Sequence, residues 1–360
     1  MDPCVRPSTT LLKEAIAGEG KRLGFLSIGV TDAAALRKRL PDLTRWLASG
    51  FSGGLAYMEN FLDRQRHLLD RFPDLKSILV LTIPYANGAR PPALPNSGQI
   101  ARYAWGRNYH RVIEKKLKQL ETFIQTQAPE TQMNRCIDTS PIQERGLAEM
   151  AGLGFIGKNT CLILPKGGSF VFLAAILTNL ELPSDQPMAW DCGSCTLCLE
   201  SCPTQALRPD RPYELDAGRC IAYLTIENKG TMDPALRPSM QNWLFGCDIC
   251  QEVCPYNRKS QHAEWPEFQA TAGAGTQLPF NEILQIRTEE EFLQKFAGTP
   301  LMRAKRAGLA RNAAVAAGNS GDQELIPILR DTLQNDSSIL VREQAAAALE
   351  ELSKSAAKSI

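Results

Sequence analysis

The first 180 residues alternate between two hydrophobic patterns. Apolar residues spaced three or four apart predict helices at Leu11–Leu23 and Val112–Gln127, the second of them rich in charge. Runs of apolar residues predict buried strands at Ser77–Ile83, Cys161–Leu164 and Ser169–Leu177. Because helical and strand-like segments alternate along the chain, we expect an α/β layered domain over residues 1–180.

The rest of the chain divides into two further parts. Residues 181–260 hold eight of the eleven cysteines, and residues 259–275 are typical of a linker. Residues 276–360 are helical and alanine-rich, and Arg311–Ala317 recurs as Arg342–Ala348 with a helix, Glu324–Leu333, between the copies. This repeat predicts HEAT-like helices that stack through small residues, although two unrelated alanine-rich helices would give the same composition. The expected fold class is α+β, with domains at residues 1–180, 181–260 and 276–360.

Composition and charge exclude several classes of protein. The formal net charge is only +1, which argues against a globally basic nucleic-acid binder. The segment Met1–Thr10 lacks the apolar region of a secretion signal, and the longest apolar run, Phe170–Leu180, is too short to span a bilayer. We therefore expect a cytoplasmic protein, in which eleven cysteines indicate metal or cluster ligation and not disulfides.

The cysteine spacing is the strongest signal in the sequence. The first group runs Cys192-x2-Cys195-x2-Cys198-x3-Cys202-Pro203, and the second, Cys247-x2-Cys250-x3-Cys254-Pro255, repeats its tail. In ferredoxins with two [4Fe–4S] clusters, the cysteine before proline ligates the other cluster. The second group lacks its first cysteine, and Cys220 is the unassigned cysteine nearest to it. We assign one cluster to Cys192, Cys195, Cys198 and Cys254, and the other to Cys202, Cys220, Cys247 and Cys250.

Zinc is the rival interpretation, because CxxC pairs also form tetrahedral zinc sites. Zinc sites do not require three cysteines at two-residue gaps followed by Cys-Pro, so the spacing favours clusters. The remaining cysteines, Cys4, Cys136 and Cys161, match no motif, and we expect them to be buried structural thiols.

A second segment, Asp138–Thr160, combines helix-start residues with three glycines. Ser140 is placed to cap a helix, Pro141 suits its first turn, and Gln143 would complete a capping box. Glycines at 152, 154 and 157 end that helix and allow close approach of the backbone to a ligand. On physical grounds Asp138 is either a helix-start carboxylate or a catalytic acid.

Clusters transfer single electrons, and the long flanking regions suggest that they supply a second centre. The chain contains no GxGxxG and no CxxCH, and its three histidines form no metal-ligand pair, so each is expected to be an ordinary polar residue. A simple electron carrier remains an alternative.

Several long segments resemble the epoxyqueuosine reductase family, which is similar in its core to cobalamin-dependent reductive dehalogenases. These are Asp138–Asn159, the CGSCTLC…CP group, Arg219–Thr225, Gly246–Cys250 and Arg102–His110. Asn108 departs from the aspartate of the corresponding family segment. The resemblance covers most of the chain and implies reduction of epoxyqueuosine to queuosine at the wobble position of tRNAs with a GUN anticodon.

The resemblance also implies cofactors and residue roles. Cobalamin would join the two clusters, and Asp138 would donate a proton with a pKa raised by an apolar pocket. The residues implied to contact cobalamin are Arg64, Tyr103, Asp138, Lys158, Asn159, Leu162, Leu173 and Asp248.

The implied partners are tRNA, through its anticodon loop, and a reduced electron donor. A strip of Arg303, Lys305, Arg306 and Arg311 could contact phosphates, although a solvated helix face is the simpler interpretation. Nothing in the sequence indicates an oligomer, and nothing in it indicates association with a membrane. A cobalamin enzyme acting on a small molecule and a zinc-binding nucleic-acid adaptor remain as alternatives.

Overall fold

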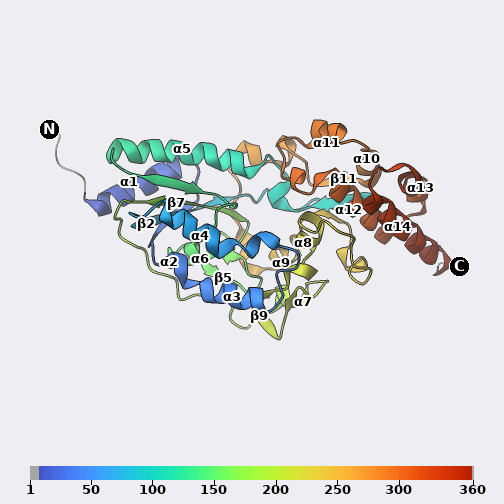
Figure 1. The fold of residues 1–360 in the computed structure, drawn as a ribbon, viewed down its shortest axis with the longest axis horizontal. Coiled ribbons are helices and arrows are strands. Elements are labelled where there is room, and N and C mark those ends of the chain that lie inside the picture. The colour runs from blue at the N-terminus through green and yellow to red at the C-terminus, as the bar shows by residue number, and fades with distance from the viewer. Residues whose placement is uncertain (1–7, 359–360) are drawn as a thin grey trace.

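A four-stranded antiparallel sheet forms the centre of the N-terminal half of the computed structural model, which describes residues 8–358 (Figure 1). The strand order is β1–β2–β7–β4: β1 is Ser27–Asp32, β2 Ser77–Pro84, β7 Val171–Thr178 and β4 Met133–Cys136. Every residue of β2 is buried, so the predicted strand is confirmed. All three pairings are antiparallel, which corrects the α/β expectation for this half to an α+β arrangement.

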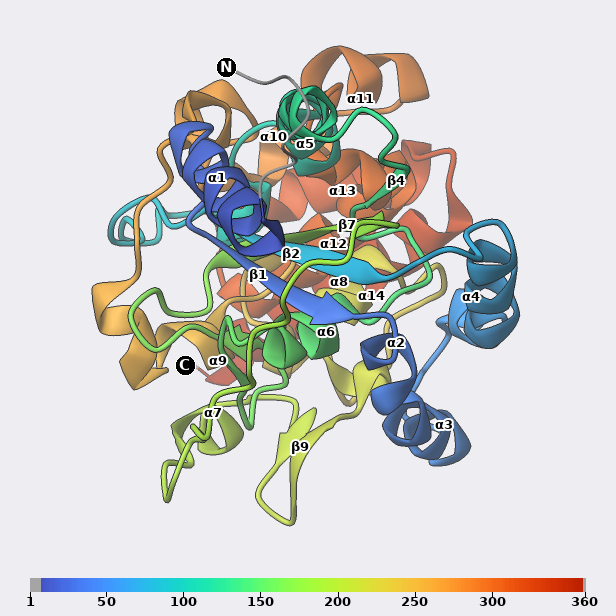
Figure 2. The same cartoon turned by 90° about the vertical axis from the view of Figure 1, so that its left-hand side faces the viewer.

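Helices cover both faces of this sheet (Figure 2). The helices α1 (Thr9–Arg22) and α5 (Tyr109–Gln127) pack with Leu79, Leu81 and Ile83 of β2, whose side chains share one face. The alternate residues, Ile78 and Val80, face α2 (Ala35–Lys38) and α6 (Glu144–Met150). Two further helices, α3 (Leu40–Ala48) and α4 (Phe61–Asp70), follow α2, and Leu68 of α4 packs into the same core as Ile78 and Val80. The predicted helices at the start of the chain and before β4 are thus confirmed.

The helix predicted after Asp138 begins later than expected. Ser140 does not cap it: α6 starts at Glu144, and its N-cap Gln143 makes no side-chain capping bond. Residues 138–143 form a turn, because the Glu144 carboxylate accepts the backbone N–H of Asp138 at 2.6 Å. The predicted end of the helix is confirmed, since Gly152 follows with a φ of +68°.

A three-stranded sheet joins segments that are distant in sequence. β3 (Ser97–Ile100) lies between β10 (Trp243–Phe245) and β11 (Gln277–Pro279). Smaller elements surround it: the hairpins β5 (Phe155–Ile156) with β6 (Leu162–Ile163) and β8 (Leu207–Arg208) with β9 (Arg211–Leu215), and the helix α8 (Ile221–Ile226).

The expectation that residues 259–275 form a linker is wrong. Trp265 and Phe268 of this segment are buried in the core beneath α1, and the indole N–H of Trp265 donates to the Leu23 carbonyl at 3.0 Å. The segment therefore packs against the first domain as a strap, because its two aromatic residues need burial.

The C-terminal region is helical, as predicted. Its helices are α10 (Phe280–Leu284), α11 (Glu289–Phe296), α12 (Lys305–Ser320), α13 (Ile326–Asn335) and α14 (Ile339–Lys358). The two copies of the repeat lie on α12 and α14, which approach closely: a Cβ added to Gly318 would lie 2.9 Å from the Ala348 Cα. Small residues thus permit the contact, and the HEAT-like classification stays a prediction.

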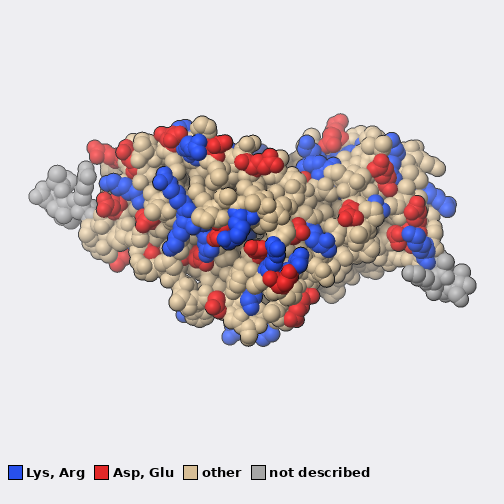
Figure 3. Space-filling view, turned by 60° about the horizontal axis from the view of Figure 1, so that its bottom comes forward, with Lys and Arg blue, Asp and Glu red and all other residues tan. Residues whose placement is uncertain are grey.

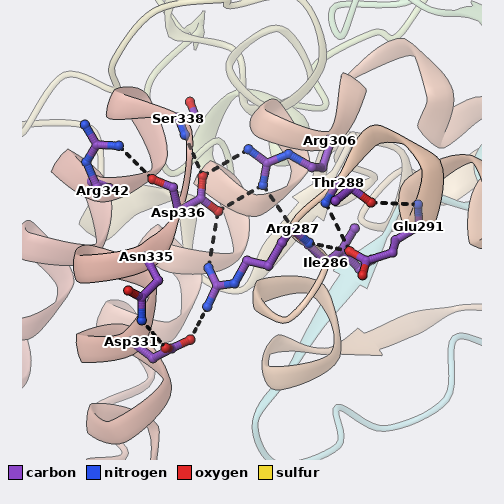
Figure 4. A network of polar contacts seen from close by, with 10 residues as sticks. All are labelled: Ile286, Arg287, Thr288, Glu291, Arg306, Asp331, Asn335, Asp336, Ser338 and Arg342. Carbon is purple, nitrogen blue, oxygen red and sulfur yellow. Dashed lines mark hydrogen bonds and ion pairs between the residues drawn. The ribbon is translucent and has the colours of Figure 1, made fainter.

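The basic strip predicted on α12 is wrong as a phosphate surface. Arg306 is buried and forms a two-bond ion pair with Asp336 at 2.9 and 3.0 Å, within a network that includes Arg287 (Figure 4). Arg311 is only 1% exposed and donates to three backbone carbonyls. Arg303 is exposed but forms an ion pair with Glu227. Of the four predicted residues, Lys305 is exposed and is not used in one of these contacts. Residues on α12 face inward because other segments cover most of the helix.

Candidate functional site

The cysteines of both motifs meet on a pair of short, packed helices. α7 (Leu197–Glu200) carries Cys198, and α9 (Ile249–Glu252) carries Cys250. A single hollow is lined by four of the thiols, from Cys192, Cys195, Cys198 and Cys254. The structure therefore brings the last cysteine of the second motif to the first three of the first motif, as the crossed ligation pattern requires.

The other four assigned cysteines, three from the motifs together with Cys220, form a second group. Cys202 and Cys220 lie close enough to Cys247 for their charge to raise the pKa of its thiol. Cys247 and Cys220 have the same effect on the thiol of Cys250. Burial raises the pKa of the Cys220 and Cys247 thiols. Two groups of four thiols are the donor set that two [4Fe–4S] clusters need, so the residues fit these cofactors. Among residues 8–358, no three His, Cys, Asp or Glu side chains are arranged around a point suited to a single metal ion.

The three unassigned cysteines have different surroundings. Cys136 is buried in the core, where burial raises its thiol pKa to about 12, so its structural role is confirmed. Cys161 is only partly buried, and it lies beside Cys250 of the second group, whose thiol acts to lower the pKa of Cys161. It is thus a contact residue of the cluster region, which its lack of a motif concealed. Cys4 lies outside the described residues.

The loop after β5 supports the cluster-binding loops. The backbone N–H of Lys158 donates to the Cys192 sulfur at 3.4 Å, and its ammonium donates to the carbonyls of Gly193 and Cys195 at 2.8 and 3.0 Å. The Asn159 amide donates to the Cys250 carbonyl at 3.4 Å. Both residues were expected to contact cobalamin, and both contact cluster-binding loops.

A cluster of acid–base groups surrounds Asp138, which follows β4 with a φ of +54°. The carboxylate oxygen Oδ2 accepts the Tyr109 hydroxyl at 2.9 Å and lies 3.1 Å from His110 Nε2. The backbone N–H of Asp138 is held by Glu144, and the Arg64 guanidinium holds the next carbonyl, that of Thr139, at 2.8 Å. A residue that is not glycine keeps a positive φ only where its surroundings fix it, and these contacts do so.

The expectation that Asp138 has a raised pKa is wrong. Burial acts to raise it, but hydrogen bonds from His110 and Tyr109 outweigh that effect, and the net pKa is lowered. The side chain is 55% exposed, so it also keeps contact with water. The neighbouring carboxyl of Glu144 behaves differently, because burial and the charge of Asp138 raise its pKa to about 8. Groups able to donate or accept a proton therefore lie directly beside the Asp138 carboxyl.

The remaining residues of the predicted cobalamin set lie in three different surroundings. Asp248 is buried, accepts the Arg102 backbone N–H at 2.8 Å and pairs with Arg90, and burial raises its pKa to about 6. Leu162 belongs to the core beside α6, and Leu173 of β7 packs against that core. Tyr103 and Arg64 lie near the acid cluster, since Tyr103 packs against Tyr109 with ring centroids 6.2 Å apart.

Sequence reasoning missed three members of the acid cluster. Tyr109, His110 and Glu144 were given no role, and His110 was taken for an ordinary polar residue. The sequence does contain a signal, because Tyr109 and His110 end the segment Arg102–His110 that was singled out by resemblance. Their contact with Asp138 spans 29 and 28 residues of sequence and could not be seen without the fold.

Comparisons with known proteins agree with this arrangement. A family profile described as "Epoxyqueuosine reductase QueG, DUF1730" matches residues 66–139, and one described as "4Fe-4S double cluster binding domain" matches residues 191–257. The chain is 39% identical over 293 residues to the epoxyqueuosine reductase of Synechocystis sp., covering 81% of this chain and 98% of that protein.

Solved structures give the same result. An epoxyqueuosine reductase from Streptococcus thermophilus matches with a TM-score of 0.84 and 28% identity, covering 95% of this chain and 90% of that one. A crystal structure of epoxyqueuosine reductase with an epoxyqueuosine-modified tRNA-Tyr stem loop matches with a TM-score of 0.83 and 31% identity, covering 96% and 93%.

Proposed function

The chain belongs to the epoxyqueuosine reductase family, and from that premise we propose that it reduces epoxyqueuosine to queuosine at wobble position 34 of tRNAs with GUN anticodons. It is an oxidoreductase, as its curated relatives are. The proposed substrates are the tRNAs for Asp, Asn, His and Tyr, and the reaction is the last step of queuosine biosynthesis.

One observation carries this proposal: an aromatic contact connects the acid cluster to a cysteine loop. Tyr103 packs on Tyr109, which donates to Asp138, and also on Phe245, with ring centroids 6.0 Å apart. Phe245 lies two residues before Cys247. Proton-donating groups therefore lie next to the segment that would deliver electrons, which suits a reduction that consumes both.

The reduction requires that two protons reach one atom, the oxygen of the epoxide. Conversion of an epoxide to an alkene takes two electrons and two protons and releases the oxygen as water. We assign Asp138 as the residue that protonates that oxygen, because an unprotonated alkoxide is a poor leaving group. Tyr109 orients the carboxylate through its hydroxyl, and Glu144 and Arg64 hold the turn that carries it.

Two [4Fe–4S] clusters and cobalamin are the proposed cofactors. The cluster ligands are the two thiol groups described above, and the matched double-cluster family supports iron–sulfur binding. A bound cobalamin would supply the nucleophilic two-electron chemistry that opens an epoxide. The predicted cobalamin contacts remain the proposal: Arg64, Tyr103, Asp138, Lys158, Asn159, Leu162, Leu173 and Asp248. Of these, Arg64, Tyr103 and Asp138 lie together, whereas Lys158 and Asn159 also contact the cluster-binding loops.

A positively charged rim near Asp138 supports binding of the tRNA. Arg64 and Arg145 are exposed, and Arg303, although paired with Glu227, is close enough to lower the pKa of Asp138 by its charge. Figure 3 shows basic side chains gathered along the middle of one face, with acidic ones between them. Loop bases are unpaired, so turning the modified base toward Asp138 costs less than it would in a duplex.

The proposal also covers the domain organisation, the location and the electron supply of the protein. We propose three domains at residues 1–180, 181–260 and 276–360, the last HEAT-like, in a cytoplasmic monomer supplied by a reduced electron donor. Across residues 8–358, no helix combines the length and apolar character needed to cross a bilayer.

The test is anaerobic reconstitution with iron, sulfide and cobalamin, followed by nucleoside analysis of tRNA that carries epoxyqueuosine. Queuosine should appear only when cobalamin and a reductant are both present. Unchanged epoxyqueuosine with a fully loaded chain would refute the proposal.

A further inference from the structure

Asn108 fixes the protonation pattern of His110. Its side-chain Oδ1 accepts the backbone N–H of His110 at 3.1 Å, as the N-cap of α5. A backbone N–H can only donate, so the accepting atom of Asn108 must be its oxygen. The same oxygen lies 3.0 Å from His110 Nδ1. Because an amide oxygen cannot donate, Nδ1 must carry the hydrogen of this bond.

This pattern places one proton between His110 and Asp138. His110 Nε2 lies 3.1 Å from Asp138 Oδ2, a distance at which one atom must donate. Either a doubly protonated ring donates to the carboxylate, or a protonated carboxyl donates to the neutral ring. In both cases the pair shares one proton, which can pass between Nε2 and Oδ2 without any rearrangement of the ring.

The His110 ring is also exposed on another side, where it borders a hollow. An open hollow of about 280 Å³ is lined by His110, Arg111, Glu114, Arg135, Ile137, Thr139 and Ser140. The charged groups facing the pair come from several elements: Arg111 and Glu114 on α5, Arg135 on β4, Glu144 on α6, and Arg303 from the C-terminal region. His110, which is 34% exposed, thus lies between this hollow and Asp138.

We propose that His110 passes protons from the solvent-open hollow to Asp138 during turnover, with Asn108 holding the ring in the required tautomer. This inference rests on the proposed function and deepens it. The departing oxygen takes up two protons, and one carboxyl holds only one. After Asp138 gives the shared proton to that oxygen, the ring carries hydrogen on Nδ1 alone. Nε2 then takes up a proton from the hollow and passes it to Oδ2. The two electrons come from the reduced donor through the clusters.

The test compares His110→Ala with a matched control, His67→Ala, because His67 is an exposed histidine on α4. His110→Ala should lower kcat at least about 100-fold, the usual contribution of a positioned acid–base group, with little change in KM for tRNA. Added imidazole should restore a large part of the rate, and iron and cobalamin contents should match those of the unchanged chain. His67→Ala should keep full activity.

Two results would overturn the proposal. Full turnover by His110→Ala removes the residue from the proton path. A loss that imidazole does not relieve, accompanied by a raised KM or lost cofactor, assigns His110 a structural role only.

A second measurement separates this inference from the proposed function. Nitrogen-15 NMR of the histidine rings should show hydrogen on Nδ1 of His110, and Asn108→Leu should lose that signature. This result does not depend on activity, so an inactive wild-type chain with the expected ring signals would refute the function and leave the hydrogen-bond assignment standing. Hydrogen absent from Nδ1 in the unchanged chain would overturn the inference itself.

Discussion

Replacing Arg311 with Met should loosen the contact between the C-terminal helices and the cysteine segment. The guanidinium donates to the carbonyls of Leu224, Asn228 and Gly230 at 2.6, 2.6 and 2.9 Å, and burial lowers its pKa to about 10. Methionine has similar length but no donor, so these carbonyls would lose their partner. Leaving a buried hydrogen-bonding group unsatisfied costs about 1–3 kcal/mol, so the loss of a donor to three carbonyls should cost about 3–5 kcal/mol in total.

The matched control is Arg303→Met, from the same predicted strip. Arg303 pairs with Glu227, but its side chain is 60% exposed, and exposed pairs contribute about 0–1 kcal/mol. The assay is hydrogen–deuterium exchange of peptides covering residues 221–230 and 305–320. A local loss of about 3–5 kcal/mol corresponds to roughly two to three and a half orders of magnitude faster exchange. Equal, small changes in both variants would refute the reasoning.

Three further predictions follow from the same structure. Cys220→Ser should reduce bound iron from about eight to about four atoms per chain, whereas Cys161→Ser should keep about eight; an iron assay decides, and equal iron in both would contradict the ligand assignment. Glu144 has a pKa of about 8 in the folded chain against an ordinary value of 4.5, so the free energy of unfolding should fall as pH rises between these values. In denaturant unfolding, Glu144→Gln should flatten this dependence on pH, and an unchanged dependence would contradict the prediction. Gly318→Val should destabilise the α12–α14 contact by about 1–3 kcal/mol, seen as a lower unfolding midpoint, because its Cβ would meet the Ala348 backbone; no change would show that the helices can separate freely.

Features encoded over a short stretch of chain were predictable. The buried strand at Ser77–Ile83 follows from consecutive apolar residues, and the grouping of Cys192, Cys195 and Cys198 follows from two-residue gaps. The meeting of these thiols with Cys254 was also expected, because the Cys-Pro motif carries that geometry. The family was recognisable for the same reason, since its motifs are continuous segments.

Features set by distant partners were not predictable. Arg306 and Arg311 have the composition of a solvated helix face, and only the fold supplies the carboxylate and carbonyls that allow their burial. Strand direction was missed because hydrophobic patterns do not encode it. The pKa of Asp138 was wrong in sign because His110 and Tyr109, its hydrogen-bond partners, come from another element.

Asp138 is the residue on which the account depends, and its replacement is the most direct test. Asp138→Asn keeps the size of the side chain and its contacts with Tyr109 and His110 while removing the acid. Queuosine formed in a single turnover on epoxyqueuosine-containing tRNA should fall by at least about 100-fold, with both cofactors still bound. Wild-type rates of queuosine formation in this variant would contradict the account.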